Sequence, residues 1–510
     1  MFPAHPWTIR RTLGLLPVLL LALAPALPLQ GQGVPTAPAF LSLDEAIELA
    51  RRHNPGYMAA QNDLSAAEWG VKAAYGQLLP SASASAGLGW QGSGAQRIGN
   101  LTLQDLGVGT QPNYYTSNYS LGLGYSINGA VFYGLSAAKA NRDQTAAAID
   151  QARLDLDTRV TLSYLDVLRQ KEAVELAGQQ LERAEFNLRL VQGQAEVGSA
   201  TGLAVNQAEV QVGRAEVALI QAENSVATAT FRLLQTIGLR PSPAVALTTA
   251  FEVSPPTWSE ADLLDMALGT NPVLQSRRFG RDAARDGVGS ARSSYFPSLN
   301  LSVGWSGFTR QASNTDLLVA QAQASSASSF ASCQNTNELY SRLADPLPSL
   351  DCSGLTFSDA DRQQIISGND VFPFDFTRSP PSASLSISVP IFQGFARQQQ
   401  VEVAQARLDD TEYQLREQEI ALQADVAIRL AQLETAYRSV ELEERNQDYA
   451  DEQLRLAREQ YRVGLIPFLD LVEAETVKVQ ADRDLLNAVY AYHDALTNLE
   501  AVVGQSLRGN

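Results

Sequence analysis

Four segments of the chain alternate apolar side chains with small polar ones, mostly serine and glycine. They cover residues 81–91, 117–127, 298–308 and 382–392, and none of them contains a charged residue. A period of two with one apolar face and one small polar face predicts a β-strand. Because soluble strands usually carry charge on their wet face, this pattern favours strands of a transmembrane barrel over half-buried strands in a soluble sandwich.

Two long polar stretches carry apolar residues that step by three and four positions. These residues are Val174, Ala177, Leu181, Ala184, Leu188 and Val191 in the first stretch, and Leu422, Val426, Leu430, Leu433, Tyr437 and Val440 in the second. The spacing predicts long helices that pack as coiled coils. The second helix, from Val401 to Val463, would be roughly 95 Å long. A Val-Gly pair interrupts the stretches at Gly198 and Gly464, where we expect each helix to turn back.

The chain is a tandem repeat. Pro55 and Pro272 are separated by the same interval as Pro80 and Pro297, whereas Gly198 and Gly464 share a second interval with Gly238 and Gly504. The second interval is longer by about 49 residues, which predicts an insertion in the second half after Pro297. We expect repeat one at 31–238, a proline-rich linker at 239–256 and repeat two at 257–510, with the insertion forming a loop at about 309–381.

Each repeat is predicted to open with a short helix. Ser42 and Ser259 stand before acidic first turns and are candidate caps. Each helix should end at an Asn-Pro pair, because the residue before a proline is pushed out of the helical region.

The N-terminus is predicted to be an export signal at about 1–30, since Arg10 and Arg11 precede an apolar run broken by prolines. The formal charge of -17 argues against a nucleic-acid partner, because phosphate binding needs a basic surface. After the signal no run of 18 or more apolar residues occurs, so a membrane span would have to be a β-barrel. Barrels of this type start at about eight strands, so four strands would have to be shared between copies of the chain.

Several motifs resemble the TolC family of outer-membrane efflux proteins. They are "LDEAIELARRHNP", "YGQLLP", "VPIFQGF" and "YRVGLIPFLDLVEAE". The resemblance implies a mixed α and β membrane protein: a homotrimer whose 12-stranded barrel, four strands per chain, continues into a coiled-coil periplasmic tunnel. It implies outer-membrane lipid, a periplasmic adaptor (membrane fusion) protein and an inner-membrane pump of the RND, ABC or MFS type as partners.

The resemblance also implies two kinds of site. The adaptor would dock on the tips at Val197, Gly198, Ser199, Val463, Gly464 and Leu465. An acidic constriction would fall on Asp470 and Glu473, three apart on one helix face. The alternatives are a helix-capping glycine without a partner and an ordinary solvated helix face. Ile466 stands where the family has a latching arginine.

Cys333 and Cys352 lie in the inserted loop and in an exported protein would form a disulfide; free thiols are the alternative. "GLGWQG" matches a nucleotide-binding pattern, but no helix is predicted after it. We find no catalytic arrangement and no metal-ligand cluster, so we expect no enzyme activity and no cofactor.

The predicted function is the outer-membrane exit duct of a tripartite efflux or type I secretion system, with the helical part in the periplasm. A free-standing porin and a structural spacer are the alternatives. The sequence leaves the substrate and the pump class open.

Overall fold

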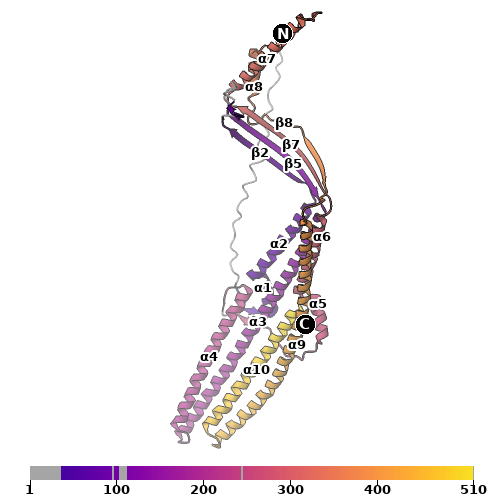
Figure 1. Ribbon diagram of the computed structural model, residues 1–510. Helices are drawn as coiled ribbons and strands as arrows, with labels where there is room; N and C mark the ends of the chain where they lie inside the picture. The colour runs from indigo at the N-terminus through magenta and orange to yellow at the C-terminus, as the bar shows by residue number, and fades with distance from the viewer. Residues whose placement is uncertain (1–35, 95–96, 103–111, 243–244, 509–510) are drawn as a thin grey trace, which may run out of the picture. The chain divides into compact units, whose positions relative to one another are not determined.

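The computed structural model describes residues 36–94, 97–102, 112–242 and 245–508 (Figure 1). The predicted export signal at 1–30 lies outside the described residues. The chain forms two compact units, and each takes segments from both repeats. The first comprises the described parts of 1–58, 153–257 and 429–501, and the second those of 59–152, 258–428 and 502–510. Helices with the length and apolar composition needed to cross a membrane are absent from the described ranges.

The short helices of the first repeat recur in the second repeat at the shorter sequence interval, the one that separates Pro55 from Pro272. Helices α1 (Leu43–His53) and α2 (Pro55–Gly76) correspond to α5 (Glu260–Thr270) and α6 (Pro272–Ser293). The Ser42 hydroxyl accepts from the Glu45 N–H, and the Ser259 hydroxyl accepts from the Asp262 N–H, both at 3.2 Å. Both predicted caps are therefore confirmed. The helices end at an asparagine followed by proline, as expected.

The sheet of the second unit is antiparallel. Its strands are β2 (Ser81–Gln91), β5 (Tyr114–Ile127), β7 (Ser298–Ala312), β8 (Thr377–Arg378) and β9 (Ser382–Ser388). Strand β5 lies between β2 and β7, and β7 pairs on its other side with both β8 and β9 (Figure 1). The predicted end of the last strand at 392 is wrong: β9 stops at Ser388, because Pro390 has no N–H for the ladder.

The register keeps each face of this sheet chemically uniform. Leu121 of β5 pairs with Ala84 of β2 and with Trp305 of β7, all on the apolar positions. On the other face the hydroxyls of Ser85 and Ser120 lie 2.8 Å apart. Hence neighbouring strands present one apolar and one polar surface, as the alternation predicted. A small hairpin of β3 (Arg97–Ile98) and β4 (Leu101–Thr102) forms a separate sheet.

The chain has two long helical hairpins, which are related by the longer sequence interval, the one that separates Gly198 from Gly464. Helices α3 (Gly129–Glu196) and α4 (Gly202–Ile237) correspond to α9 (Ala396–Arg462) and α10 (Phe468–Val503). Helices α4 and α10 have 36 residues each. The predicted start of the second long helix at Val401 is too late, since α9 begins at Ala396. All twelve residues of the predicted apolar stripes are buried or half-buried.

The core of the first unit includes the segment that we expected to be a plain linker. Strand β6 (Ala246–Leu247) pairs in parallel with β1 (Phe40–Leu41), and Leu239 and Val245 are buried. The hydroxyl of buried Tyr164 in α3 donates to the Leu41 carbonyl at 2.9 Å. It also accepts from the N–H groups of residues 248 and 249. These bonds tie the segment to the long helix.

The insertion has secondary structure of its own. It contains α7 (Asp316–Ser341), a 3-10 turn η1 (Ser353–Leu355) and α8 (Asp359–Gly368). Strand β7 continues to Ala312, so the insertion starts later than the predicted residue 309. Cys333 and Cys352 are joined as a disulfide with their Cα atoms 5.9 Å apart.

Candidate functional site: the tips of the two hairpins

The two hairpin turns have the same backbone structure. At the first, the Gly198 N–H donates to the Ala195 carbonyl and the Ser199 N–H to the Gln194 carbonyl. At the second, the Gly464 N–H donates to the Tyr461 carbonyl and the Leu465 N–H to that of residue 460. Both patterns are Schellman caps, which place a left-handed residue just past the helix.

The glycines at these turns are required by backbone geometry. Gly198 and Gly464 both have a φ of +75°, a value that side chains with a Cβ rarely adopt. Both glycines therefore cap their helices, as the alternative interpretation in the sequence analysis holds. It does not exclude a docking role, because a turn can cap a helix and also be recognised.

The six predicted docking residues are exposed. Val463 is 62% and Leu465 is 75% exposed at the second turn, and Val197 is 79% exposed at the first. Gly198, Ser199 and Gly464 are also open to solvent. Exposed aliphatic side chains on a rigid cap form a surface that a partner can bury.

The returning helices start differently at the two tips. Thr201 caps α4, and its hydroxyl accepts from the Ala204 N–H at 3.3 Å. At the second tip Pro467 directly precedes α10, and its carbonyl accepts from the Asp470 N–H at 3.2 Å. Proline is tolerated there because the first N–H groups of a helix have no intrahelical partner.

Asp470 and Glu473 lie in the first two turns of α10 and are both exposed. A carboxylate in a first turn also interacts favourably with the helix dipole, so Asp470 has a structural role in any case. Their common face is open, which is what a charged constriction requires.

The two tips are joined to one another by side chains that were not predicted from the sequence as site residues. The Tyr461 hydroxyl of α9 lies 2.7 Å from Gln194 Oε1 of α3. Glu475 of α10 accepts from Asn187 of α3 at 2.6 Å and from Arg458 of α9 at 3.4 Å. Burial raises the pKa of Tyr461, so its hydroxyl stays protonated and can donate. A tyrosine and an asparagine in a polar helix carry no local signal of a partner so distant in sequence.

Ile466 is part of an apolar cluster that closes the tip region. The cluster is built around Val191, Ala208, Leu454, Ala457, Tyr461, Phe468, Leu471 and Ala474. Ile466 packs against it from the turn. The residue at the position of the family's latching arginine therefore makes apolar contacts in this chain.

We expect Glu475→Ala to loosen the tips. The change removes the acceptor shared by Asn187 and Arg458, and a hydrogen bond to a charged group contributes about 1.5–3 kcal/mol. Amide hydrogen exchange in residues 187–196 should become about tenfold faster or more. The exposed neighbour Glu473→Ala serves as control, and equal exchange in both variants would contradict the role of Glu475.

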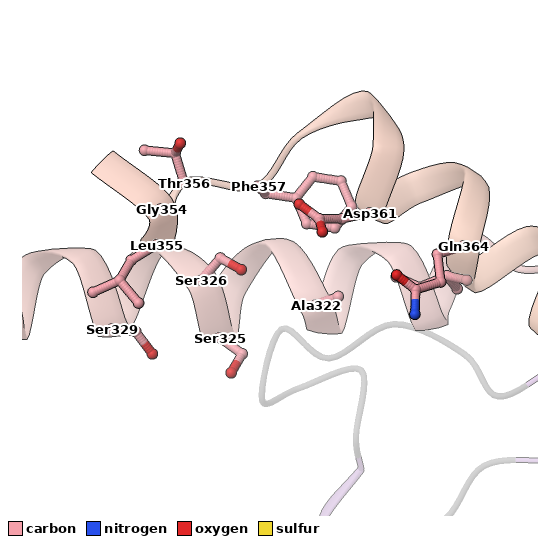
Figure 2. A pocket seen from close by; sticks show the side chains of 11 residues that line it. Ala322, Ser325, Ser326, Ser329, Gly354, Leu355, Thr356, Phe357, Asp361 and Gln364 are labelled. Atoms are coloured by element: carbon pink, nitrogen blue, oxygen red, sulfur yellow. The ribbon is translucent and has the colours of Figure 1, made fainter. Parts of the chain in front are cut away.

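The insertion contains a hollow of its own in the second unit. It measures about 440 Å³ and lies between α7 and residues 354–365 (Figure 2). Ser325, Ser326 and Ser329 of α7 line one side, and Thr356 and Asp361 line the other. Clusters of three or more metal-ligating side chains do not occur within the described part of the chain.

Comparison with known proteins identifies the family. The family model described as outer membrane efflux protein matches residues 46–239 and 263–505. The chain belongs to this family. The resemblance to TolC proteins is thereby confirmed, and both repeats are covered. The protein is an outer-membrane efflux component and not an enzyme.

Two relatives illustrate the distance within the family. Protein CyaE of Bordetella pertussis is 25% identical over 404 residues, which cover 79% of this chain and 71% of CyaE. Outer membrane protein TolC of Vibrio cholerae is 27% identical over 265 residues, which cover 52% of this chain and 58% of TolC. The alignment with TolC thus spans little more than half of that relative.

Solved structures agree in fold. The structure of CusC gives a TM-score of 0.67 at 17% identity and covers 91% of this chain and 92% of its own. The outer membrane protein VceC of Vibrio cholerae gives 0.65 at 17% identity, with 91% and 97% covered. At this identity the likeness establishes the fold.

Proposed function

We propose that the chain is the outer-membrane exit duct of a tripartite efflux or type I secretion assembly. It would conduct substrates passively after an inner-membrane pump and a periplasmic adaptor deliver them. The observation that carries this proposal is the pair of long hairpins with matched, exposed tips. A free-standing porin needs no such hairpins, and a spacer needs no matched tips.

The membrane part would be a barrel shared by three copies. Strands β2 and β9 lie at the two sides of the sheet, where their outer edges have no neighbour among the described residues. Open edges of this kind are normally paired or protected. Pairing β2 of one copy with β9 of the next would close a homotrimeric barrel of twelve strands, with the apolar face toward lipid.

The hairpins would form the periplasmic tunnel. Helices α4 and α10, with 36 residues each, are roughly 54 Å long. Val197, Gly198 and Ser199 at one tip, and Val463, Gly464 and Leu465 at the other, would bind the adaptor. Asp470 and Glu473 from each copy would ring the tunnel near this end and select for cations.

The disulfide between Cys333 and Cys352 would brace the insertion at the barrel mouth, since oxidising compartments preserve such bonds.

The related proteins CzcC of Cupriavidus metallidurans and OpmQ of Pseudomonas aeruginosa are named for cobalt-zinc-cadmium resistance and pyoverdine export. Such diverse cargo supports a general conduit whose pump, of the RND, ABC or MFS type, sets the selectivity.

The decisive test is Leu465→Asp in a strain that lacks the native gene. The side chain is exposed and the cap bond is made by its backbone, so the fold should persist. We expect the amount of protein in the outer membrane to stay unchanged. The efflux rate should fall about tenfold or more, the loss typical of one central interface residue.

Ile420→Asp is the matched control, since Ile420 is also an exposed aliphatic residue, on α9 away from the tip. Wild-type efflux in Leu465→Asp would speak against docking at the tips. A deletion strain with undiminished efflux would speak against the duct itself.

A further inference from the structure

The apolar face of the sheet ends in a buried pair of hydroxyl groups. Pairing of β5 with β7 sets Leu121 opposite Trp305 and, four residues further along each strand, Ser117 opposite Thr309 on the same face. Ser117 and Thr309 are each 2% exposed, and their hydroxyls lie 2.7 Å apart. On a barrel strand these positions would face lipid, where hydroxyl groups are costly. Another part of the chain therefore covers them.

The covering segment is the end of the insertion, residues 369–376, which we call the strap. Its first side chain, Asn369, accepts from the Ala312 N–H at 2.9 Å and donates to the Ala312 carbonyl at 2.8 Å, which fixes the strap to the end of β7. The Phe372 N–H then donates to the Gln311 side chain at 2.8 Å. Because Gln311 belongs to the same face as the buried hydroxyls, the strap turns onto the apolar face at this point.

The strap then crosses β5 at the hydroxyl pair. The Pro373 carbonyl accepts from the Ser117 hydroxyl at 2.5 Å, and the rings of Phe372 and Tyr115 have their centroids 5.7 Å apart. The strap therefore supplies both a hydrogen-bond acceptor and apolar contact to this part of the sheet. Toward α3 the same face is open, since Leu121 is 47% exposed.

Arg378 follows the strap and lies at the border of the open face. It pairs with Gly307 in the ladder of β8 with β7, so both residues are on the apolar face. The Tyr119 ring covers Gly307, where a Cβ would lie 2.5 Å from it, and Phe376 packs edge-on against Tyr119 with centroids 4.9 Å apart. The Arg378 side chain is exposed, and no residue in the described part of the chain forms an ion pair with it.

The position of Arg378 along the strands matches the border of a membrane band. The open apolar rows extend along β5 from Ile127 to Tyr119, which is roughly 27 Å of strand and roughly 20 Å of height at the usual tilt. The apolar band of membrane barrels is about 25 Å tall. The Arg378 guanidinium therefore lies near the level at which lipid headgroups begin.

The chemistry at Arg378 suits a phosphate at a lipid surface. A guanidinium binds phosphate oxygens through paired charged hydrogen bonds. The neighbouring rings of Tyr119 and Phe376 are of the kind that borders the apolar band of membrane barrels. The outer leaflet of an outer membrane contains lipopolysaccharide, whose lipid A carries phosphate at the border of the hydrocarbon. With a formal charge of -17 the chain as a whole repels anions, so binding would come from this local arrangement.

We propose that Arg378, with Tyr119 and Phe376, binds the lipid A phosphate of lipopolysaccharide on the outward face of the barrel. The strap then marks the level at which lipid ends and water begins. The proposal rests on the barrel of the preceding subsection, with its apolar face toward lipid. It is independent of the substrate and of the docking of the adaptor.

Melting of the purified full chain in detergent tests the phosphate site, because a ligand that binds the folded state raises the melting temperature. Lipopolysaccharide should raise the melting temperature of wild type by about 4 °C or more. Dephosphorylated lipopolysaccharide should give a much smaller shift. Arg378→Gln should reduce the shift with intact lipopolysaccharide to that same level.

Arg310→Gln is the matched control for this measurement. Arg310 is also an exposed arginine near this end of the sheet, but it lies on the opposite face, where its guanidinium is 3.9 Å from the centre of the Tyr114 ring. It should keep the full shift with lipopolysaccharide. A full shift in Arg378→Gln, or an equal and Arg378-dependent shift with phosphatidylglycerol, would overturn the lipopolysaccharide site.

Efflux measurements separate this proposal from the duct. Arg378→Gln should restore efflux in the deletion strain as well as wild type does, since the residue lies on the outward face of the sheet. A variant that keeps efflux but loses the lipid shift supports the site and leaves the duct intact. Failure of wild type to restore efflux would contradict the duct and would not alter the lipid shift.

Cysteine labelling tests the strap without changing Arg378. Phe374 and Leu385 are 66% and 65% exposed, but Phe374 is in the strap and Leu385 is on the apolar face of β9. In intact outer membranes a water-soluble maleimide should modify Phe374→Cys about tenfold faster or more than Leu385→Cys, because a thiol reacts as the thiolate, which forms in water. Cys333 and Cys352 are joined and do not react. After denaturation in SDS both variants should react equally, whereas equal rates in the membrane would overturn the strap as the border of the lipid.

Discussion

Lys478→Met is expected to destabilise the second hairpin by about 3 kcal/mol, the cost of leaving a buried charge without its partner. Lys478 is 8% exposed, and its Nζ lies 2.7 Å from Asp482 Oδ1 and 2.7 Å from Asp451 Oδ1. Asp482 is also buried and accepts from Gln447 at 2.8 Å. Methionine fills the same space but leaves the Asp482 carboxylate without a countercharge.

The measurement is the temperature at which the purified protein loses its helical circular dichroism signal. Lys478→Met with Asp482→Leu is the informative companion, since removing both charges should recover most of the loss. Asp451→Asn should have a smaller effect, because Asp451 is 59% exposed and water can replace it. Equal melting temperatures for wild type and Lys478→Met would show that the ion pair of Lys478 and Asp482 contributes nothing to the free energy of unfolding.

Asp470→Asn combined with Glu473→Gln is expected to raise single-channel conductance and to weaken block by multivalent cations about tenfold or more. In a trimer the two residues place about six carboxylates around a narrow axis, and crowded like charges attract cations strongly. Both side chains are exposed, so neutral replacements of the same shape should leave the fold intact and remove only the small contribution of Asp470 to the helix dipole.

Glu441→Gln with Glu444→Gln is the matched control for this experiment. These carboxylates are also exposed and three residues apart, but they lie on α9 away from the turn. Planar-bilayer recordings of the control should resemble wild type. If the Asp470 and Glu473 double variant also resembles wild type, the constriction lies elsewhere and the two carboxylates are an ordinary solvated helix face.

The elements of this protein follow largely from local signals in its sequence. Alternation of apolar and small polar residues placed the strands, and the 3-4 spacing placed the long helices. Ser42, Ser259 and the two Asn-Pro pairs marked helix ends through bonds that reach only three or four residues. Gly198 and Gly464 marked the tips, because a left-handed backbone position favours glycine wherever it occurs.

Local signals missed the positions where distant segments decide the outcome. The stretch after Leu239 reads as a loop, yet Tyr164 binds it and β6 pairs with β1. The insertion shows no clear periodicity, although it forms α7 and α8 around a disulfide. Strand β9 ends at Ser388, before the predicted residue 392, because Pro390 interrupts the ladder although the alternating pattern continues past it.

The sequence by itself determined the repeat, which is read from equal intervals between matching residues. It also determined the long helices, the main strands and the residues presented at the tips, since each of these depends on neighbours within one or two turns of chain. Only the tertiary structure decided that Tyr461 meets Gln194, that Glu475 joins three helices, and that Lys478 is buried between two carboxylates. Such contacts depend on how helices far apart in the chain are brought together, and a polar side chain in a helix has the same local pattern whether it faces water or a partner.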